Sequence, residues 1–184
     1  MIYLIGGTAR SGKSTVRKLL CQKYRISGIS TDHITQMMAI ALPEYNLNFD
    51  SKWEIGFEKM NELIKALVTH HPDNQDFVIE GWQISPKLVK IYQEYSKNHL
   101  RICILGCADA VCCQKMLDIR SNPSYNEWTD KYSDQNLEKL VKELIKTSKR
   151  HKKECKKFGV QYFETSKNFE EMTQKAVNYL VNTN

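Results

Sequence analysis

Gly7-Thr8-Ala9-Arg10-Ser11-Gly12-Lys13-Ser14 is the stretch that decides the fold, because it matches the phosphate-loop pattern G-x-x-x-x-G-K-[ST] at every fixed position. Each fixed residue has its own physical task. Gly7 and Gly12 carry no Cβ, so the backbone can pass through positive φ and point its N–H groups inward. Lys13 would place its ammonium group on the β- and γ-phosphates of a nucleotide, and the hydroxyl of Ser14 would bind Mg²⁺.

The residues on either side of this loop supply the structural context that the motif requires. Tyr3, Leu4 and Ile5 form a short apolar strand before the loop, and residues 15–21 have the apolar spacing of a helix after it. A glycine turn with an incidental lysine is the alternative interpretation. The sequence predicts a site for ATP and Mg²⁺, with the nucleotide contacted by Gly7, Thr8, Ala9, Arg10, Ser11, Gly12, Lys13, Ser14 and Thr15.

Length and composition indicate a single ordinary globular domain over residues 1–184. Hydrophobic residues make up 41% and charged residues 26% of the 184-residue chain. Its apolar runs fall short of the ~20 residues that a membrane span needs, and the N-terminal run is too short for a signal peptide. The six cysteines form no C-x-x-C pair, so we expect reduced thiols and a cytoplasmic protein.

Charge is distributed unevenly around a net value of +6. Residues 135–157 hold nine Lys or Arg against three acids, whereas residues 31–75 hold seven acids, three lysines and no arginine. The basic segment could bind nucleic acid, but its apolar positions predict a packed helix with a solvated outer face. We therefore expect no nucleic-acid partner and no membrane partner, and the oligomeric state stays open.

Strands alternate with helices along the whole chain. Further strands are expected at 26–32, 77–81, 101–106 and 160–163, and further helices at 33–42, 52–70, 85–98, 108–118, 134–158 and 169–181. Such alternation predicts an α/β fold in which helices cover both faces of a parallel sheet. Ligands of these sheets bind at the carboxyl ends of the strands. The loop, Asp32 after the second strand and Glu80 after the third should converge there, which favours an enzyme.

At this point the chain resembles the P-loop small-molecule kinases, the group of nucleoside monophosphate, shikimate and gluconate kinases. Among them it is most similar to hydroxyl kinases of the chloramphenicol phosphotransferase type, which have a Thr-Asp pair like Thr31-Asp32. The resemblance implies a three-layer P-loop NTPase fold with five parallel strands in the order 2-3-1-4-5. It also implies a helical acceptor-binding insert at about 33–75 and a lid at about 119–134. The phosphate loop is its only highly specific motif.

The family's catalytic residues carry over by position. Asp32 corresponds to the acid that accepts the proton of the acceptor hydroxyl, although it could simply cap the next helix. Glu80 ends the Walker B strand and could hold Mg²⁺ or bond the acceptor, or it could be solvated. Arg120 stands in the lid, where it could contact the transferred phosphoryl, stack on adenine, or be a solvated helix-end arginine. Residues 165–168 occupy the position at which relatives hold adenine. Lys13, Asp32 and Arg120 are thus the expected catalytic residues, with Ser14 and Glu80 at the metal.

The acceptor is the less determined half of the predicted reaction. A phosphorylated acceptor needs guanidinium clamps, which residues 31–75 cannot provide because they contain no arginine. Their aromatic and acidic residues favour an uncharged or cationic hydroxyl compound, unless those aromatics are core. A nucleoside, nucleotide or polynucleotide 5′-hydroxyl kinase and a non-catalytic nucleotide-binding protein are the alternatives. The tentative acceptor site comprises Asp32, Trp53, Glu80, Gly81 and Trp82.

Overall fold

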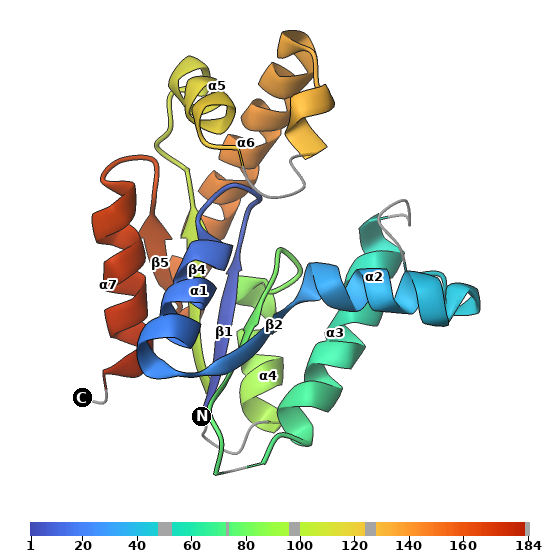
Figure 1. Ribbon diagram of the computed structural model, residues 1–184. Coiled ribbons are helices and arrows are strands. Elements are labelled where there is room, and N and C mark those ends of the chain that lie inside the picture. Colours follow the sequence, from blue (N-terminus) through green and yellow to red (C-terminus); the bar gives the residue numbers. More distant parts are fainter. Residues whose placement is uncertain (48–52, 73, 96–99, 124–127, 183–184) are drawn as a thin grey trace.

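A computed structural model describes residues 1–47, 53–72, 74–95, 100–123 and 128–182 of the chain (Figure 1). Five strands form one parallel sheet in the order β2-β3-β1-β4-β5, as predicted. Their bounds are β1 Ile2–Gly7, β2 Ser27–Ser30, β3 Phe77–Glu80, β4 Leu100–Gly106 and β5 Gln161–Glu164. β1 lies in the middle, and all six of its residues are buried. This is the near-continuous apolar run expected of a strand covered on both faces.

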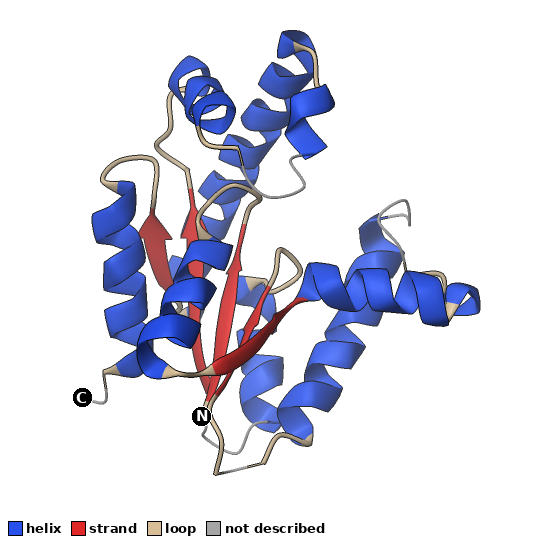
Figure 2. Cartoon of the chain, viewed as in Figure 1, coloured by secondary structure: helices blue, strands red, loops and turns tan. Residues whose placement is uncertain are grey.

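The helices lie on the two faces of this sheet and beyond its carboxyl edge (Figure 2). Their bounds are α1 Lys13–Tyr24, α2 Thr31–Ala41, α3 Trp53–Thr69, α4 Val89–Tyr95, α5 Cys112–Ser121, α6 Asp134–Phe158 and α7 Phe169–Val181. Three short 3₁₀ helices cover Pro43–Tyr45, Pro86–Leu88 and Trp128–Lys131. In the described ranges, no helix is both long enough and apolar enough to span a bilayer.

Two hydrophobic cores fill the space between the sheet and its helices. One core joins the sheet to α1 and α7 through Val16, Leu20 and Val177. The other joins the opposite face to α3, α4 and α6, with Ile64 and Tyr92 buried at its centre. The chain is therefore a three-layer α/β/α structure, and the predicted fold class is confirmed.

Several element boundaries differ from the sequence prediction for local reasons. β2 ends at Ser30, whose hydroxyl accepts a hydrogen bond from the backbone N–H of Asp32 at 3.3 Å. Ser30 is thus the helix N-cap, and Asp32 lies in the first turn of α2 instead of at a strand tip. The helix expected at 108–118 begins only at Cys112, because a turn closed by the Ala110 N–H and the Cys107 carbonyl precedes it. The helix expected at 85–98 is divided into a 3₁₀ turn and α4.

Candidate functional site

The phosphate loop connects β1 to α1 at the carboxyl edge of the sheet. Gly7 and Gly12 adopt φ values of 132° and 94°, as predicted, and Arg10 has a φ of 57°. A Cβ on Gly7 would lie 1.9 Å from the carbonyl oxygen of Leu105, so only glycine fits where the loop rests on β4. α1 begins at Lys13, so the positive end of its dipole faces the same space as the loop.

Hydrogen bonds from three side chains hold the carbonyl groups of the loop. The hydroxyl of Ser11 donates to the Thr8 carbonyl at 2.8 Å, and that of Thr165 donates to the Ser11 carbonyl at 2.9 Å. The ammonium group of Lys13 donates to the Thr8 carbonyl at 2.7 Å. The lysine of the motif therefore rests on the loop itself, within reach of any phosphate that the loop would bind.

The pKa values of Lys13 and Asp32 are each influenced by the other group and by the charge of Glu80. Burial lowers the pKa of the Lys13 ammonium, an effect that the carboxylates of Glu80 and Asp32 oppose. The side chain of Asp32 is exposed at the surface, but partial loss of hydration raises its pKa; Lys13 acts to lower it, and the charge of Glu80 acts to raise it. Lys13 and the two carboxylates therefore lie near one another at the carboxyl edge of the sheet.

Glu80 is a buried carboxylate at the end of β3, with only 3% of its surface exposed. Its Oε1 accepts a hydrogen bond from the Ser14 hydroxyl at 3.1 Å and lies 3.6 Å from Nε of Arg17. A serine that donates its proton to a carboxylate keeps its oxygen lone pairs available for a cation, so this pair suits Mg²⁺ beside a nucleotide. Across the described ranges, no cluster of three or more His, Cys, Asp or Glu gathers. Phosphates and water would supply the other ligands of the ion.

The first turn of α2 sets the position of Asp32. Thr31 is fully buried, and its hydroxyl donates to Oε1 of Gln83 at 2.6 Å. A Cβ on Gly81 would come within 1.9 Å of the Thr31 hydroxyl oxygen, so the missing side chain of Gly81 lets α2 start directly against β3. Gly81 thus has a packing role, and its contact with an acceptor stays a prediction.

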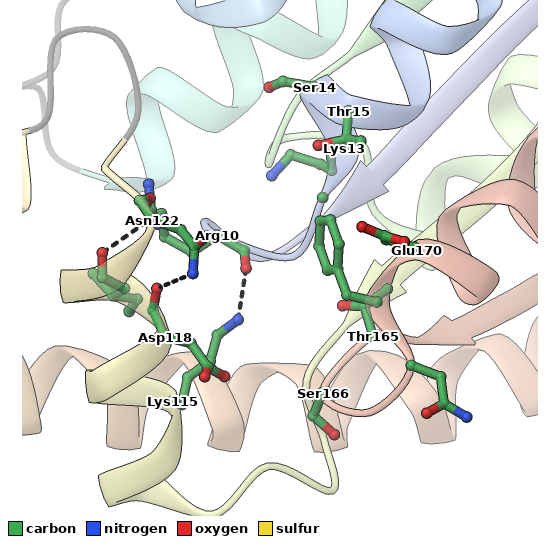
Figure 3. Close-up of a pocket in the computed structure, with 14 residues that line it drawn as sticks. Arg10, Lys13, Ser14, Thr15, Lys115, Asp118, Asn122, Thr165, Ser166 and Glu170 are labelled. Atoms are coloured by element: carbon green, nitrogen blue, oxygen red, sulfur yellow. Dashed lines mark hydrogen bonds between the residues drawn. The ribbon is translucent and has the colours of Figure 1, made fainter.

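A pocket of about 620 Å³ opens beside the loop, between α5 and the segment that joins β5 to α7 (Figure 3). The loop and α1 contribute Arg10, Gly12, Lys13, Ser14 and Thr15. The opposite walls are formed by Lys115, Asp118, Ile119, Asn122, Thr165, Ser166, Asn168, Phe169 and Glu170. Residues 165–168 are where the sequence placed the adenine site, and three of those four line the pocket.

Arg10 and Lys115 join the loop to α5 across this pocket (Figure 3). The guanidinium of Arg10 donates to the carbonyls of Ile119 and Asn122, which lie at the C-terminal end of α5. The buried ammonium group of Lys115 donates to the Arg10 carbonyl at 2.9 Å. Sequence reasoning missed Lys115, since no motif distinguishes it from the other 26 Lys and Arg residues.

Other predicted site residues lie outside this pocket. The guanidinium of Arg120 donates to the carbonyls of Thr129 and Tyr132 and lies 3.3 Å from the Asp134 carboxylate, so in this structure it joins parts of the lid region to each other. The half-buried Trp82 has its ring centroid 6.5 Å from that of Phe57. α3 begins at Trp53, but the side chain of Trp53 lies outside the described residues.

No protein-family model matches the chain. A stretch of 90 residues is 42% identical to a cytidylate kinase of Fusobacterium nucleatum. This stretch covers 48% of the chain and 38% of that kinase, so the match spans well under half of the curated relative.

Solved kinases resemble the chain over nearly its whole length. Shikimate kinase from Bacteroides thetaiotaomicron gives a TM-score of 0.61 at 12% identity, with 97% of this chain and 94% of that chain covered. Shikimate kinase from Acinetobacter baumannii, in complex with shikimate, gives 0.56 at 17% identity, covering 96% and 90%. A gluconokinase from Sinorhizobium meliloti gives 0.54 at 14% identity, covering 97% and 90%. The chain therefore has the fold of the P-loop small-molecule kinases.

Proposed function

We propose that the protein is a kinase that uses ATP and Mg²⁺ to phosphorylate a hydroxyl group of an uncharged or cationic small molecule. Lys13 and the loop bind the triphosphate, and Ser14 holds Mg²⁺ with the support of Glu80. Asp32 accepts the proton of the acceptor hydroxyl while the hydroxyl oxygen bonds to the γ-phosphorus of ATP, the bond from that phosphorus to the β–γ bridging oxygen breaks, and ADP leaves.

One observation supports this proposal most directly: Asp32 lies near enough to Lys13 and Glu80 for their charges to act on its pKa. The charges of Lys13 and Glu80 both act on the pKa of Asp32, which supports a position of this carboxylate near the loop. A protein that only binds nucleotide has no use for a second carboxylate there. A hydroxyl kinase needs one to align and deprotonate its acceptor.

The acceptor class rests on the charges around Asp32. α2 carries no arginine or lysine, and Arg17, on the adjoining helix α1, is paired with Glu80. A phosphorylated acceptor would need a bidentate guanidinium near Asp32. The lack of a free guanidinium on α2 and the neighbouring aromatic rings of Phe57 and Trp82, if they line the acceptor site, instead suit a polyol, a nucleoside or an amino sugar.

A screen of acceptors tests this function. Purified protein is unfolded thermally with a non-hydrolysable ATP analogue and Mg²⁺, with one candidate acceptor added at a time, because a ligand of the folded state raises the unfolding temperature. Compounds that shift the temperature are then assayed for phosphorylation with ATP, using Lys13→Met as the inactive control. Turnover of a neutral or cationic hydroxyl compound supports the proposal, whereas turnover of nucleoside monophosphates alone contradicts the acceptor class.

A nucleotide kinase is the second candidate, and the 42% identity to a cytidylate kinase over 90 residues favours it. Cytidine and cytidine monophosphate therefore belong in the screen as a matched pair that differs only by one phosphate. Faster turnover of the nucleoside supports a hydroxyl kinase, and faster turnover of the monophosphate supports a nucleotide kinase.

A further inference from the structure

The buried Lys13 and the half-buried Arg17 lie near the carboxylates of Asp32 and Glu80, but the two cations are not paired with them in the same way. Oε1 of Glu80 accepts the hydrogen bond from the Ser14 hydroxyl and also forms the ion pair with the Arg17 guanidinium. Lys13 instead donates to the backbone carbonyl of Thr8 at 2.7 Å. Among the described residues, neither carboxylate forms an ion pair with Lys13, although both act on its pKa.

The helix α1 explains how Arg17 reaches Glu80. Arg17 follows Lys13 by four residues, so both side chains project from the same side of the helix, one turn apart. The side chain of Arg17 is 18% exposed and that of Glu80 is 4% exposed, so their attraction is little screened by water. Nε of Arg17 forms no hydrogen bond within the described part of the chain. The interaction that the structure shows for this atom is its ion pair with Oε1 of Glu80.

A buried carboxylate must be compensated by some cation, because an unpaired charge is costly in a low-dielectric site. Without Arg17, the cation that remains near Glu80 is the ammonium group of Lys13. Lys13 would then turn from the loop towards the carboxylate. Its charge would be partly neutralised before any phosphate arrived.

We propose that Arg17 is a positioning residue that compensates Glu80 and thereby keeps the ammonium group of Lys13 available for the nucleotide phosphates. This inference rests on the donor half of the proposed function, nucleotide binding by the loop. It is independent of which acceptor is phosphorylated.

The first test measures the binding of ADP in EDTA by titration calorimetry, so that neither metal nor acceptor contributes. Arg17→Met should weaken ADP binding about tenfold. Lys18→Met, which removes an exposed cation from the next position of the same helix, should change it less than twofold. Equal affinities for wild type and Arg17→Met would overturn the proposal.

The second test asks whether Arg17 acts through Glu80. In the double variant Arg17→Met/Glu80→Gln no carboxylate remains to attract Lys13, so ADP affinity in EDTA should return to within threefold of wild type. A double variant as weak as Arg17→Met would show that Arg17 contacts the nucleotide directly, which also overturns the proposal. Phosphoryl transfer should not recover, because Glu80 is still missing from the metal site.

A third variant covers the case in which Arg17→Met does not fold. Arg17→Lys retains the charge near Glu80 and should bind ADP within threefold of wild type, whereas a tenfold loss would contradict charge compensation. All readouts are taken without an acceptor. A normal ADP affinity in wild type combined with no turnover of any hydroxyl compound would refute the proposed kinase reaction and leave this inference intact.

Discussion

Asp32 is the single residue on which the proposed transfer depends most directly. It lies in the first turn of α2, where the charges of Lys13 and Glu80 act on it, and partial loss of hydration raises its pKa. A carboxylate whose pKa is moved towards neutrality is a stronger base than an ordinary aspartate. Because the pKa of Asp32 is raised, its ionisation should affect the reaction rate within the pH range that can be assayed.

Replacing Asp32 by asparagine should separate catalysis from binding. Asp32→Asn keeps the size of the side chain but cannot accept a proton, so the transfer rate should fall about 100-fold or more. Affinity for the nucleotide, measured by calorimetry, should remain within about threefold. In wild type, kcat/KM should fall as the pH drops through the raised pKa of Asp32, at a higher pH than the ordinary ~3.9. A variant with full activity would exclude Asp32 as the base.

His151 is a buried histidine of α6 that should make stability depend on pH. Burial lowers its pKa to about 4 from 6.5, and its Nδ1 has no hydrogen-bond partner among the described residues. The unfolded chain therefore binds a proton more readily than the folded chain between these two values, and stability rises with pH across that window. From pH 7 to pH 5 the folded state should lose about 2 kcal/mol through this residue.

Urea unfolding at pH 7 and pH 5 measures this effect. His151→Leu should reduce the loss between the two pH values by about that amount, whereas His33→Gln, at an exposed position, should leave it unchanged. An identical pH dependence in wild type and His151→Leu would show that His151 does not titrate differently on folding.

At the scale of elements, the contact between α2 and the segment that directly follows β3 sets the position of Asp32, the proposed base. Thr31 fills the space beside Gly81, and the Thr31 hydroxyl binds Gln83. This contact fixes the start of α2 relative to the end of β3. Asp32 follows immediately, so a displacement of α2 moves the carboxylate with it.

Gly81→Ala should therefore harm transfer more than nucleotide binding. The added Cβ would overlap Thr31 and cost about 1–3 kcal/mol of stability. As α2 shifts, the transfer rate should fall at least about tenfold, because transfer is sensitive to small misplacement. Nucleotide affinity should stay nearly constant.

A second glycine provides the control for this variant. Gly159→Ala is strained by a φ of 69° but has open space around its Cβ, and it should lose about 1 kcal/mol with unchanged transfer. Equal transfer rates in Gly81→Ala and Gly159→Ala would mean that the contact between Thr31 and Gly81 does not position Asp32.

At the scale of the whole molecule, the sheet is sealed between two cores while α2 projects away from it (Figure 1). Every residue of β1 is buried, whereas only Thr31 and Thr35 are buried in α2, and the side chain of Ile40 is 77% exposed. Backbone groups with few buried neighbours open at lower free energy than those in a core.

Hydrogen exchange followed by mass spectrometry should show this difference. Amides of β1 should exchange only through global unfolding, and those of residues 33–41 at least about tenfold faster through local opening. MgADP should slow exchange in the phosphate loop and at α5, which Arg10 and Lys115 join. Equal exchange in α2 and β1 would indicate that α2 is covered by something beyond this chain.

The sequence by itself determined the class of fold and the conformation of the phosphate loop, and it predicted the donor half of the proposed site. The phosphate loop is a local motif whose backbone conformation follows from its glycines, and the alternation of apolar strands with amphipathic helices leads to a covered parallel sheet. Strand order came from resemblance to a family, because pairing between strands is not encoded in any one segment.

Only the tertiary structure decided the partners of individual charges. Arg17 and Glu80 are 63 positions apart, Lys115 and Arg10 are 105 apart, and nothing in their local sequence connects them. Arg120 illustrates the same limit, since a lid arginine could face a phosphate, and here it binds backbone carbonyls within the lid region. A local pattern fixes backbone conformation, whereas the partner of a long charged side chain is set by which distant segments the fold brings within a few ångströms.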